Sequence, residues 1–169
     1  QADFLLSQCE LMMASYGNPL MPIEKSLIDR CISLVYRDYL KRPTPENMPI
    51  LGDLYQCLRA QDNHTADDLA TAMEIYVTGS LSYLNHRTNV DLNNRLVCYN
   101  TSKMGQGLKK LVMANVQKHI WQRTTINRYA GVTTRIFLDE FHMLLKEPQT
   151  AAYTAEIYKR FRKWNGIPT

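Results

Sequence analysis

Two adjacent carboxylates, Asp139 and Glu140, follow a short apolar segment in RIFLDEFHMLLKEPQT, residues 135–150. The RIFL segment has the composition of a buried strand, and the sequence after the acids is typical of a helix. In open α/β sheets, ligands bind beyond the carboxyl ends of the strands, which is where these acids would lie. In phosphate-hydrolysing P-loop enzymes, two acids at this position have different duties: one orients Mg²⁺ through a coordinated water, and the other polarises the attacking water.

The same pattern also has a structural interpretation, because Asp139 could cap a following helix. A glycine-rich phosphate loop of the form GxxxxGK[ST] is not found in the sequence. The nearest stretch, MGQGLKK at 104–110, has no Gly five residues before Gly107 and no Ser or Thr after Lys109, so it is interpreted as a helix start. The chain is therefore not expected to bind ATP tightly by itself.

Histidine and cysteine offer little further chemistry. His142 lies close enough to the acids to suggest a metal ligand, but no second His or Cys stands at a suitable spacing, which favours a packing role. The other three histidines are isolated and are assigned no chemistry. The cysteines form no CxxC pair and are interpreted as reduced core residues of a cytosolic protein: Cys9, Cys31, Cys57 and Cys98.

The composition is that of a globular protein. The chain has 169 residues, of which 45% are hydrophobic and 21% charged, enough for one domain with a core. The net charge is +4, and the Lys and Arg residues are scattered except near the C-terminus. The charge alone is therefore weak support for direct nucleic-acid binding, which stays open. No apolar run approaches the ~20 residues that span a bilayer, so membrane contact is expected only through partners.

The elements that must position the acids are mostly helices. Apolar spacing predicts helices at about 4–12, 23–40, 50–61 and 66–77, the last with a capping box from Thr65 and Asp68. The second half predicts a strand at 95–99, a helix at 108–123, a strand at 135–138, a helix at 148–164, and a new strand after the helix stop at Gly166. The predicted fold class is α/β and mostly helical: an all-helical lobe, residues 1–80, followed by a partial parallel βαβ sheet, residues 81–169.

Both ends of the chain suggest a piece of a larger protein. The sequence begins without Met, already in helical periodicity, and stops at NGIPT as a strand is expected to begin.

Three segments carry a resemblance to a known family: residues 135–169, MEIYVTGSLSYLNHRTNVDLNNRLVCYN at 73–100, and EKSLIDRCISLVYRDYL at 24–40. They resemble the conjugative type IV secretion ATPases of the TraE/TraC-like family, in the form found in Gram-positive conjugative elements and transposons. That family belongs to the HerA/FtsK group of hexameric P-loop motors. The resemblance implies a RecA-like core with a helical lobe inserted before its acidic, Walker B type strand. The phosphate loop would precede Gln1, and a polar strand bearing Gln would follow Thr169.

The resemblance also implies roles for particular residues. Asp139 would hold Mg²⁺ through water, and Glu140 would be the general base. The segment FRKWNG at 161–166 resembles the Arg-Lys-x-Gly pattern that carries a trans-acting arginine. The matching residue here is Arg162, Arg160 is a second candidate for the same catalytic role, and Lys163 is a neighbour. These cations would also suit a helix C-terminus, and Glu156 with Arg160 makes an ordinary i,i+4 pair. Where the family often has an acid at the end of the preceding strand, this chain has Asn100.

The function that this resemblance implies is ATP hydrolysis, with ATP and Mg²⁺, in a hexamer that energises conjugative DNA transfer or type IV secretion. The full-length protein would be cytoplasmic, held at the inner face of the membrane by other secretion components, and this chain alone would be inactive. The alternative is a non-catalytic helical module that docks secretion components. A glycine-rich loop encoded before Gln1 would distinguish the two.

Overall fold

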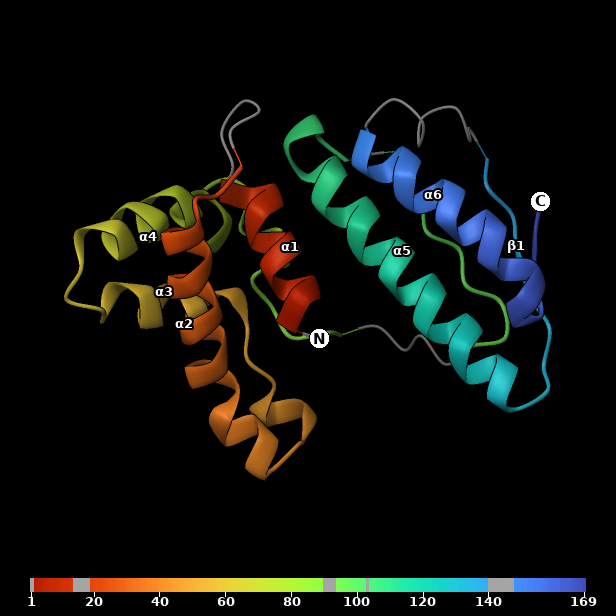
Figure 1. The fold of residues 1–169 in the computed structure, drawn as a ribbon, viewed down its shortest axis with the longest axis horizontal. Helices are drawn as coiled ribbons and strands as arrows, with labels where there is room; N and C mark the ends of the chain where they lie inside the picture. Colours follow the sequence, from red (N-terminus) through yellow and green to blue (C-terminus); the bar gives the residue numbers. More distant parts are fainter. Residues whose placement is uncertain (1, 14–18, 90–93, 103, 140–147) are drawn as a thin grey trace. The chain divides into compact units, whose positions relative to one another are not determined.

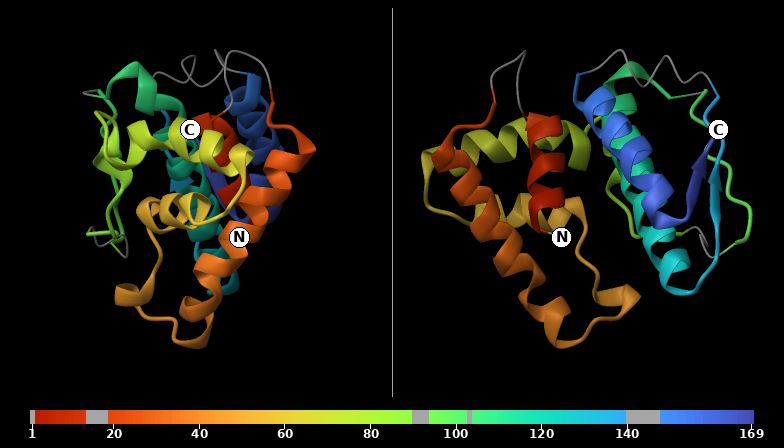
Figure 2. Two further views of the ribbon diagram at one scale, coloured as in Figure 1. Left: turned by 90° about the vertical axis from the view of Figure 1, so that its left-hand side faces the viewer. Right: turned by 45° about the vertical axis from the view of Figure 1, so that its right-hand side comes forward.

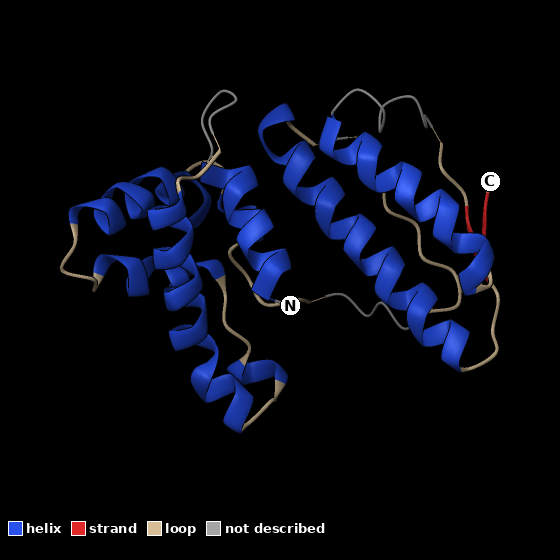
Figure 3. Ribbon diagram, in the orientation of Figure 1, coloured by secondary structure: helices blue, strands red, loops and turns tan. Residues whose placement is uncertain are grey.

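The computed structural model describes residues 2–13, 19–89, 94–102, 104–139 and 148–169. The elements, in which η denotes a 3₁₀ helix, are α1 (Ala2–Met13), α2 (Pro22–Lys41), η1 (Pro45–Asn47), α3 (Leu51–Arg59), α4 (His64–Val77), η2 (Ser82–Leu84), α5 (Gln106–Tyr129), β1 (Thr134–Ile136), α6 (Pro148–Phe161), η4 (Arg162–Trp164) and β2 (Gly166–Pro168). Helices predominate, and the described strands are short (Figure 3). The chain forms two compact units, Gln1–Leu108 and Lys109–Thr169.

The first unit is a helical lobe built on α2, α3 and α4, with α1 packed against α2 and α4 (Figures 1 and 2). Apolar side chains at helical spacing form its core, and the fully buried ones are Ile28, Cys31, Leu58, Ala66, Ala70 and Met73. Burial of such side chains is the main stabilising contribution in a lobe of short helices, because helices of this length are marginal alone.

Polar residues at the helix starts satisfy backbone N–H groups. The Met21 N–H donates to the Glu24 carboxylate at 2.6 Å at the start of α2, and Pro22 occupies the first turn. The prediction that Thr65 caps α4 is wrong. The helix begins at His64, and the Ala66 N–H donates to the Asn63 side chain at 3.2 Å. Asn63 holds the extended backbone that an N-cap requires, so it ends the loop two residues earlier than predicted.

The second unit contains a parallel pair of strands joined by a helix. Residues 134–136 of β1 pair with 166–168 of β2, and α6 makes the crossover between them (Figure 1). Ile136 and Phe161 form a buried cluster, against which Ile120, Trp121 and Leu138 pack. The predicted strand at 135–138 and the strand expected after Gly166 are thus confirmed, within two residues at the ends.

The predicted strand at 95–99 is wrong. These residues have no regular structure, and 85% of the Leu96 side chain is exposed. A strand needs a hydrogen-bonded neighbour, and in the described residues the sheet has two strands only, β1 and β2. The βαβ unit is therefore β1–α6–β2, one helix later than predicted, and α5 precedes it.

Burial separates the cysteines. Cys9 and Cys31 are buried, and burial raises the pKa of each thiol to about 12. Cys57 is partly buried, whereas Cys98 is exposed, which corrects the prediction that all are core residues. In the described part of the chain, none of the helices combines the length and hydropathy that crossing a bilayer requires. The boundary predicted between residues 80 and 81 stays a prediction for the full-length protein.

Two leucines test the lobe core with the same substitution. Leu58 is fully buried, whereas Leu40 is 72% exposed. Leu58→Ala should lower the free energy of unfolding by about 2–5 kcal/mol, because it removes buried methyl groups and leaves a cavity. Leu40→Ala should change it by less than about 0.5 kcal/mol. Urea unfolding of the chain, followed by circular dichroism, measures both, and equal losses would contradict the assignment of the core.

Candidate functional site

Asp139 lies at the carboxyl end of β1. The Leu138 N–H donates to the Thr169 carbonyl at 3.1 Å, and the Thr169 N–H donates to the Ile136 carbonyl at 2.8 Å. Pairing of the two strands therefore continues to the residue before Asp139, whose side chain is exposed. Because the carboxyl ends of parallel strands meet at one edge of a sheet, Asp139 occupies the edge where α/β folds bind ligands.

The residues that follow lie outside the described part of the chain. Both Glu140 and His142 belong to residues 140–147, so the general base and the possible metal ligand stay predictions. Among the described residues there is no cluster of three or more His, Cys, Asp or Glu side chains that could hold a metal. An exposed Asp139 nevertheless fits Mg²⁺, which keeps several waters and binds through one or two carboxylates together with phosphate oxygens.

The chain turns sharply between α6 and β2, in the basic segment at residues 159–166. Helix α6 ends at Phe161, η4 covers residues 162–164, and Asn165 adopts the left-handed conformation with φ 56° and ψ 35°. Asn is one of the few residues that tolerate this conformation. Gly166 then begins β2 so close to Phe161 that an added Cβ would lie 2.7 Å from the ring Cδ1 atom. Asn165 and Gly166 therefore determine the backbone conformation of the turn between η4 and β2.

The candidate arginines differ in their surroundings. The Arg160 guanidinium forms an ion pair with Glu156 one turn earlier on α6, as the i,i+4 interpretation expected. The backbone of Arg162 begins η4, but its side chain lies outside what the structure describes. Lys163 is exposed. Arg160 thus has a local structural partner, and Arg162 stays the candidate for action on a neighbouring site.

Helix α5 holds the turn by an aromatic contact that the sequence did not predict. The Trp164 ring lies 4.9 Å from the Trp121 ring between centroids, and the Arg128 guanidinium carbon lies 4.3 Å from the Trp164 centroid. We call Trp121, Arg128 and Trp164 the aromatic clamp. The i,i+7 spacing of Trp121 and Arg128 places both on one face of α5, and this spacing is the signal that could have paired them.

Hydrogen bonds join the turn, and also α5, to the start of β1. The Thr134 N–H donates to the Asn165 carbonyl at 3.1 Å, and the Thr133 hydroxyl donates to the Asn165 side-chain oxygen at 3.3 Å. The Asn127 amide donates to the Thr134 hydroxyl at 2.8 Å. The turn is thus tied to the amino end of β1, whereas Asp139 follows its carboxyl end.

Two other sequence features have structural roles. The Asn100 side-chain oxygen accepts from the Ser102 N–H at 3.0 Å and from its hydroxyl at 2.7 Å, so Asn100 closes a turn and does not end a strand. The MGQGLKK stretch leads into α5, which begins at Gln106, as its interpretation as a helix start requires.

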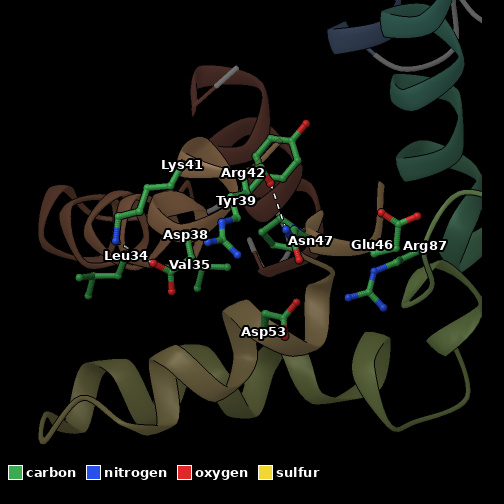
Figure 4. A pocket seen from close by; sticks show the side chains of 11 residues that line it. Leu34, Val35, Asp38, Tyr39, Lys41, Arg42, Glu46, Asn47, Asp53 and Arg87 are labelled. Carbon is green, nitrogen blue, oxygen red and sulfur yellow. Dashed lines mark hydrogen bonds and ion pairs between the residues drawn. The ribbon is translucent and has the colours of Figure 1, made fainter. Parts of the chain in front are cut away.

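The helical lobe has an open hollow of about 700 Å³ between the second half of α2, η1 and the start of α3 (Figure 4). Its charged lining residues are Asp38, Lys41, Arg42, Glu46, Asp53 and Arg87. The Lys41 ammonium lies 3.1 Å from Asp38. The pKa of Glu46 is lowered by a backbone hydrogen bond, by Thr44 and by the charge of Arg87. With three cations and three anions, the lining selects no ligand by charge.

Comparisons with known proteins show the fold. VirB4 of Thermoanaerobacter pseudethanolicus superposes with a TM-score of 0.81 and 21% sequence identity over 99% of this chain. The chain spans 47% of that structure's length, about half. No family model matches the sequence, and no curated protein matches it either. The chain therefore has the fold of a VirB4 segment: mostly helical, with a small parallel sheet.

Two glycines test the tight turn before β2. Gly166→Ala should destabilise the chain by about 1–3 kcal/mol, because the new methyl group must displace the buried Phe161 ring. Gly105→Ala is the matched control, since nothing lies within 4 Å of its added Cβ. Thermal unfolding of both variants provides the measurement. A Gly166→Ala variant as stable as the control would show that the turn is not close-packed.

Proposed function

We propose that this chain is part of a type IV secretion ATPase of the TraE/TraC-like family, and that the full-length protein hydrolyses ATP to energise conjugative transfer. The single observation that carries the proposal is the VirB4 fold over 99% of the chain, with Asp139 exposed at the carboxyl edge of its sheet. The resemblance in three sequence segments and the likeness in fold both support this proposal.

The chemistry follows from the position of the acids. Asp139 would hold Mg²⁺ through water, and Glu140, the next residue, would be the general base that accepts a proton from the attacking water. When bound, ATP and Mg²⁺ supply the phosphoryl group and neutralise the charge that develops on it. A phosphate loop elsewhere in the full-length protein holds the nucleotide, since this sequence contains none.

The path of the chain supports an arginine that acts on a neighbouring subunit. The turn after Arg162 is bonded to Thr134, at the amino end of β1, whereas Asp139 lies five residues further along an extended chain. At about 3.3 Å per residue, five residues separate the two by roughly 16 Å, more than an arginine side chain spans. Arg162 therefore serves the nucleotide of the next protomer, and such head-to-tail contacts close into a ring, which we propose to be a hexamer.

The remaining features of the proposal concern location and partners. The full-length protein works in the cytoplasm, at the inner face of the membrane, where other type IV secretion components hold it. The helical lobe, which contributes none of the proposed catalytic groups, is the part available for docking them.

Glu140→Gln in the full-length protein tests the general base. The amide cannot accept a proton, so turnover should fall about 100-fold or more while ATP binding stays close to wild type. The variant Asp29→Asn, an exposed acid on α2, is the control and should hydrolyse ATP normally. Steady-state hydrolysis and nucleotide titration measure the two quantities. Unchanged turnover would remove Glu140 from the mechanism, and a full-length protein that neither binds nor hydrolyses ATP would favour the docking module.

Arg162→Ala tests the shared site. Alone it should lower turnover about 10³-fold, as loss of an arginine finger does. Mixed with Glu140→Gln subunits it should regain activity, because each Glu140→Gln subunit donates an arginine to an intact neighbouring site. Arg160→Ala is the matched comparison and should keep most of the activity, since that guanidinium pairs with Glu156. Mixed oligomers without any recovery would show that the arginine does not act in trans.

A further inference from the structure

The aromatic clamp joins two segments that are far apart in the sequence. Trp164, from η4, contacts Trp121 of α5 at 4.9 Å between ring centroids, and Trp121 also lies 6.2 Å from the buried Phe161 ring. The Arg128 guanidinium covers Trp164 at 4.3 Å, within the range of a cation–π contact. The indole of Trp164 is therefore fixed by a second indole and by a planar cation, two residues after Arg162.

The backbone beside the clamp is held as well. The Asn165 carbonyl and side chain accept hydrogen bonds from Thr134 and Thr133, and Gly166 lies directly against Phe161. Asn165 tolerates the left-handed conformation, and these hydrogen bonds hold it there. Contacts on both sides of η4 thus hold the backbone of the turn at residues 162–164 in place.

Packing of the core does not account for the Arg128 contact. Phe161 is fully buried and already closes the apolar cluster with Ile136, whereas Trp164 is only partly buried and Arg128 is exposed. An exposed cation–π contact adds little to folding stability. The Arg128 contact therefore contributes little to the core, yet it holds Trp164, two residues after Arg162. A role in positioning Arg162 accounts for such a contact.

We propose that Trp121, Arg128 and Trp164 are positioning residues that aim Arg162 at the nucleotide of the neighbouring subunit. This inference rests on the proposed function, because it needs Arg162 to act in trans. Catalysis by positioned charge is sensitive to geometry, and a displacement of about 1 Å can cost about 100-fold in rate. Arginine suits the clamp because its planar guanidinium stacks on an indole face, which the compact ammonium of lysine does not reproduce.

The test uses the full-length protein with Arg128→Ala, Arg128→Lys and, as control, Arg135→Ala, an exposed arginine of β1 in the same unit. Arg128→Ala should lower kcat about 10- to 100-fold and change the KM for ATP less than about twofold, because its own nucleotide site is intact. Arg128→Lys should lie between Arg128→Ala and wild type, Trp164→Phe should keep more activity than Trp164→Ala, and the melting temperature of Arg128→Ala should match the control.

Mixed oligomers separate positioning from a structural defect. Arg128→Ala subunits combined with Glu140→Gln subunits should regain activity, as Arg162→Ala subunits should. The Glu140→Gln subunit donates a correctly positioned Arg162 to the intact nucleotide site of its Arg128→Ala neighbour. Loss of ATP affinity and melting temperature together, without recovery on mixing, would overturn the inference. Normal kcat in Arg128→Ala, when Arg162→Ala is inactive, would also overturn it and leave the proposed function intact. If Arg162→Ala itself hydrolyses ATP normally, the trans-acting arginine of the proposed function fails first.

Discussion

The parallel pairing of β1 with β2 is the constraint on which the second unit depends. Parallel neighbours cannot be joined by a tight turn, so the chain must cross over, and α6 with its buried Phe161 makes that crossover. The crossover reverses the chain twice. As a result, Asp139 leaves the sheet at its carboxyl edge, while η4 lies at the amino edge beside Thr134. One short unit thus presents an acid and a basic turn at opposite edges.

Because the two groups lie at opposite edges, the β1–α6–β2 unit could serve two nucleotide sites in the proposed motor. In that proposal, its carboxyl edge would contribute acids to the protomer's own nucleotide, and its amino edge would contribute an arginine to the next protomer. Both edges belong to one βαβ unit, so the basic turn and the strand that leads to Asp139 are connected within it. The hydrogen bonds of Asn165 to the residues that begin β1 are the physical connection.

The helical lobe contributes differently. Its core of helices α1 to α4 is complete without the sheet, and none of the proposed catalytic residues belongs to it. The hollow beside α2 carries cations and anions in equal number, so it does not resemble the strongly one-signed sites that bind phosphates. Its own core and its polar surface suit the docking of other proteins that we propose for this lobe.

The sequence by itself determined the features that depend on neighbours along the chain: the helices, the apolar strand before Asp139, the turn at Gly166 and the Arg160–Glu156 pair. Each is set by spacings of one to four residues, which are visible in a string of letters. Only the folded structure shows that residues 95–99 are not a strand, that Cys98 is exposed, and that Trp164 contacts both Trp121 and Arg128. These outcomes require partners that are distant in the sequence, because strand pairing and side-chain burial are decided by which surfaces meet after the chain has folded.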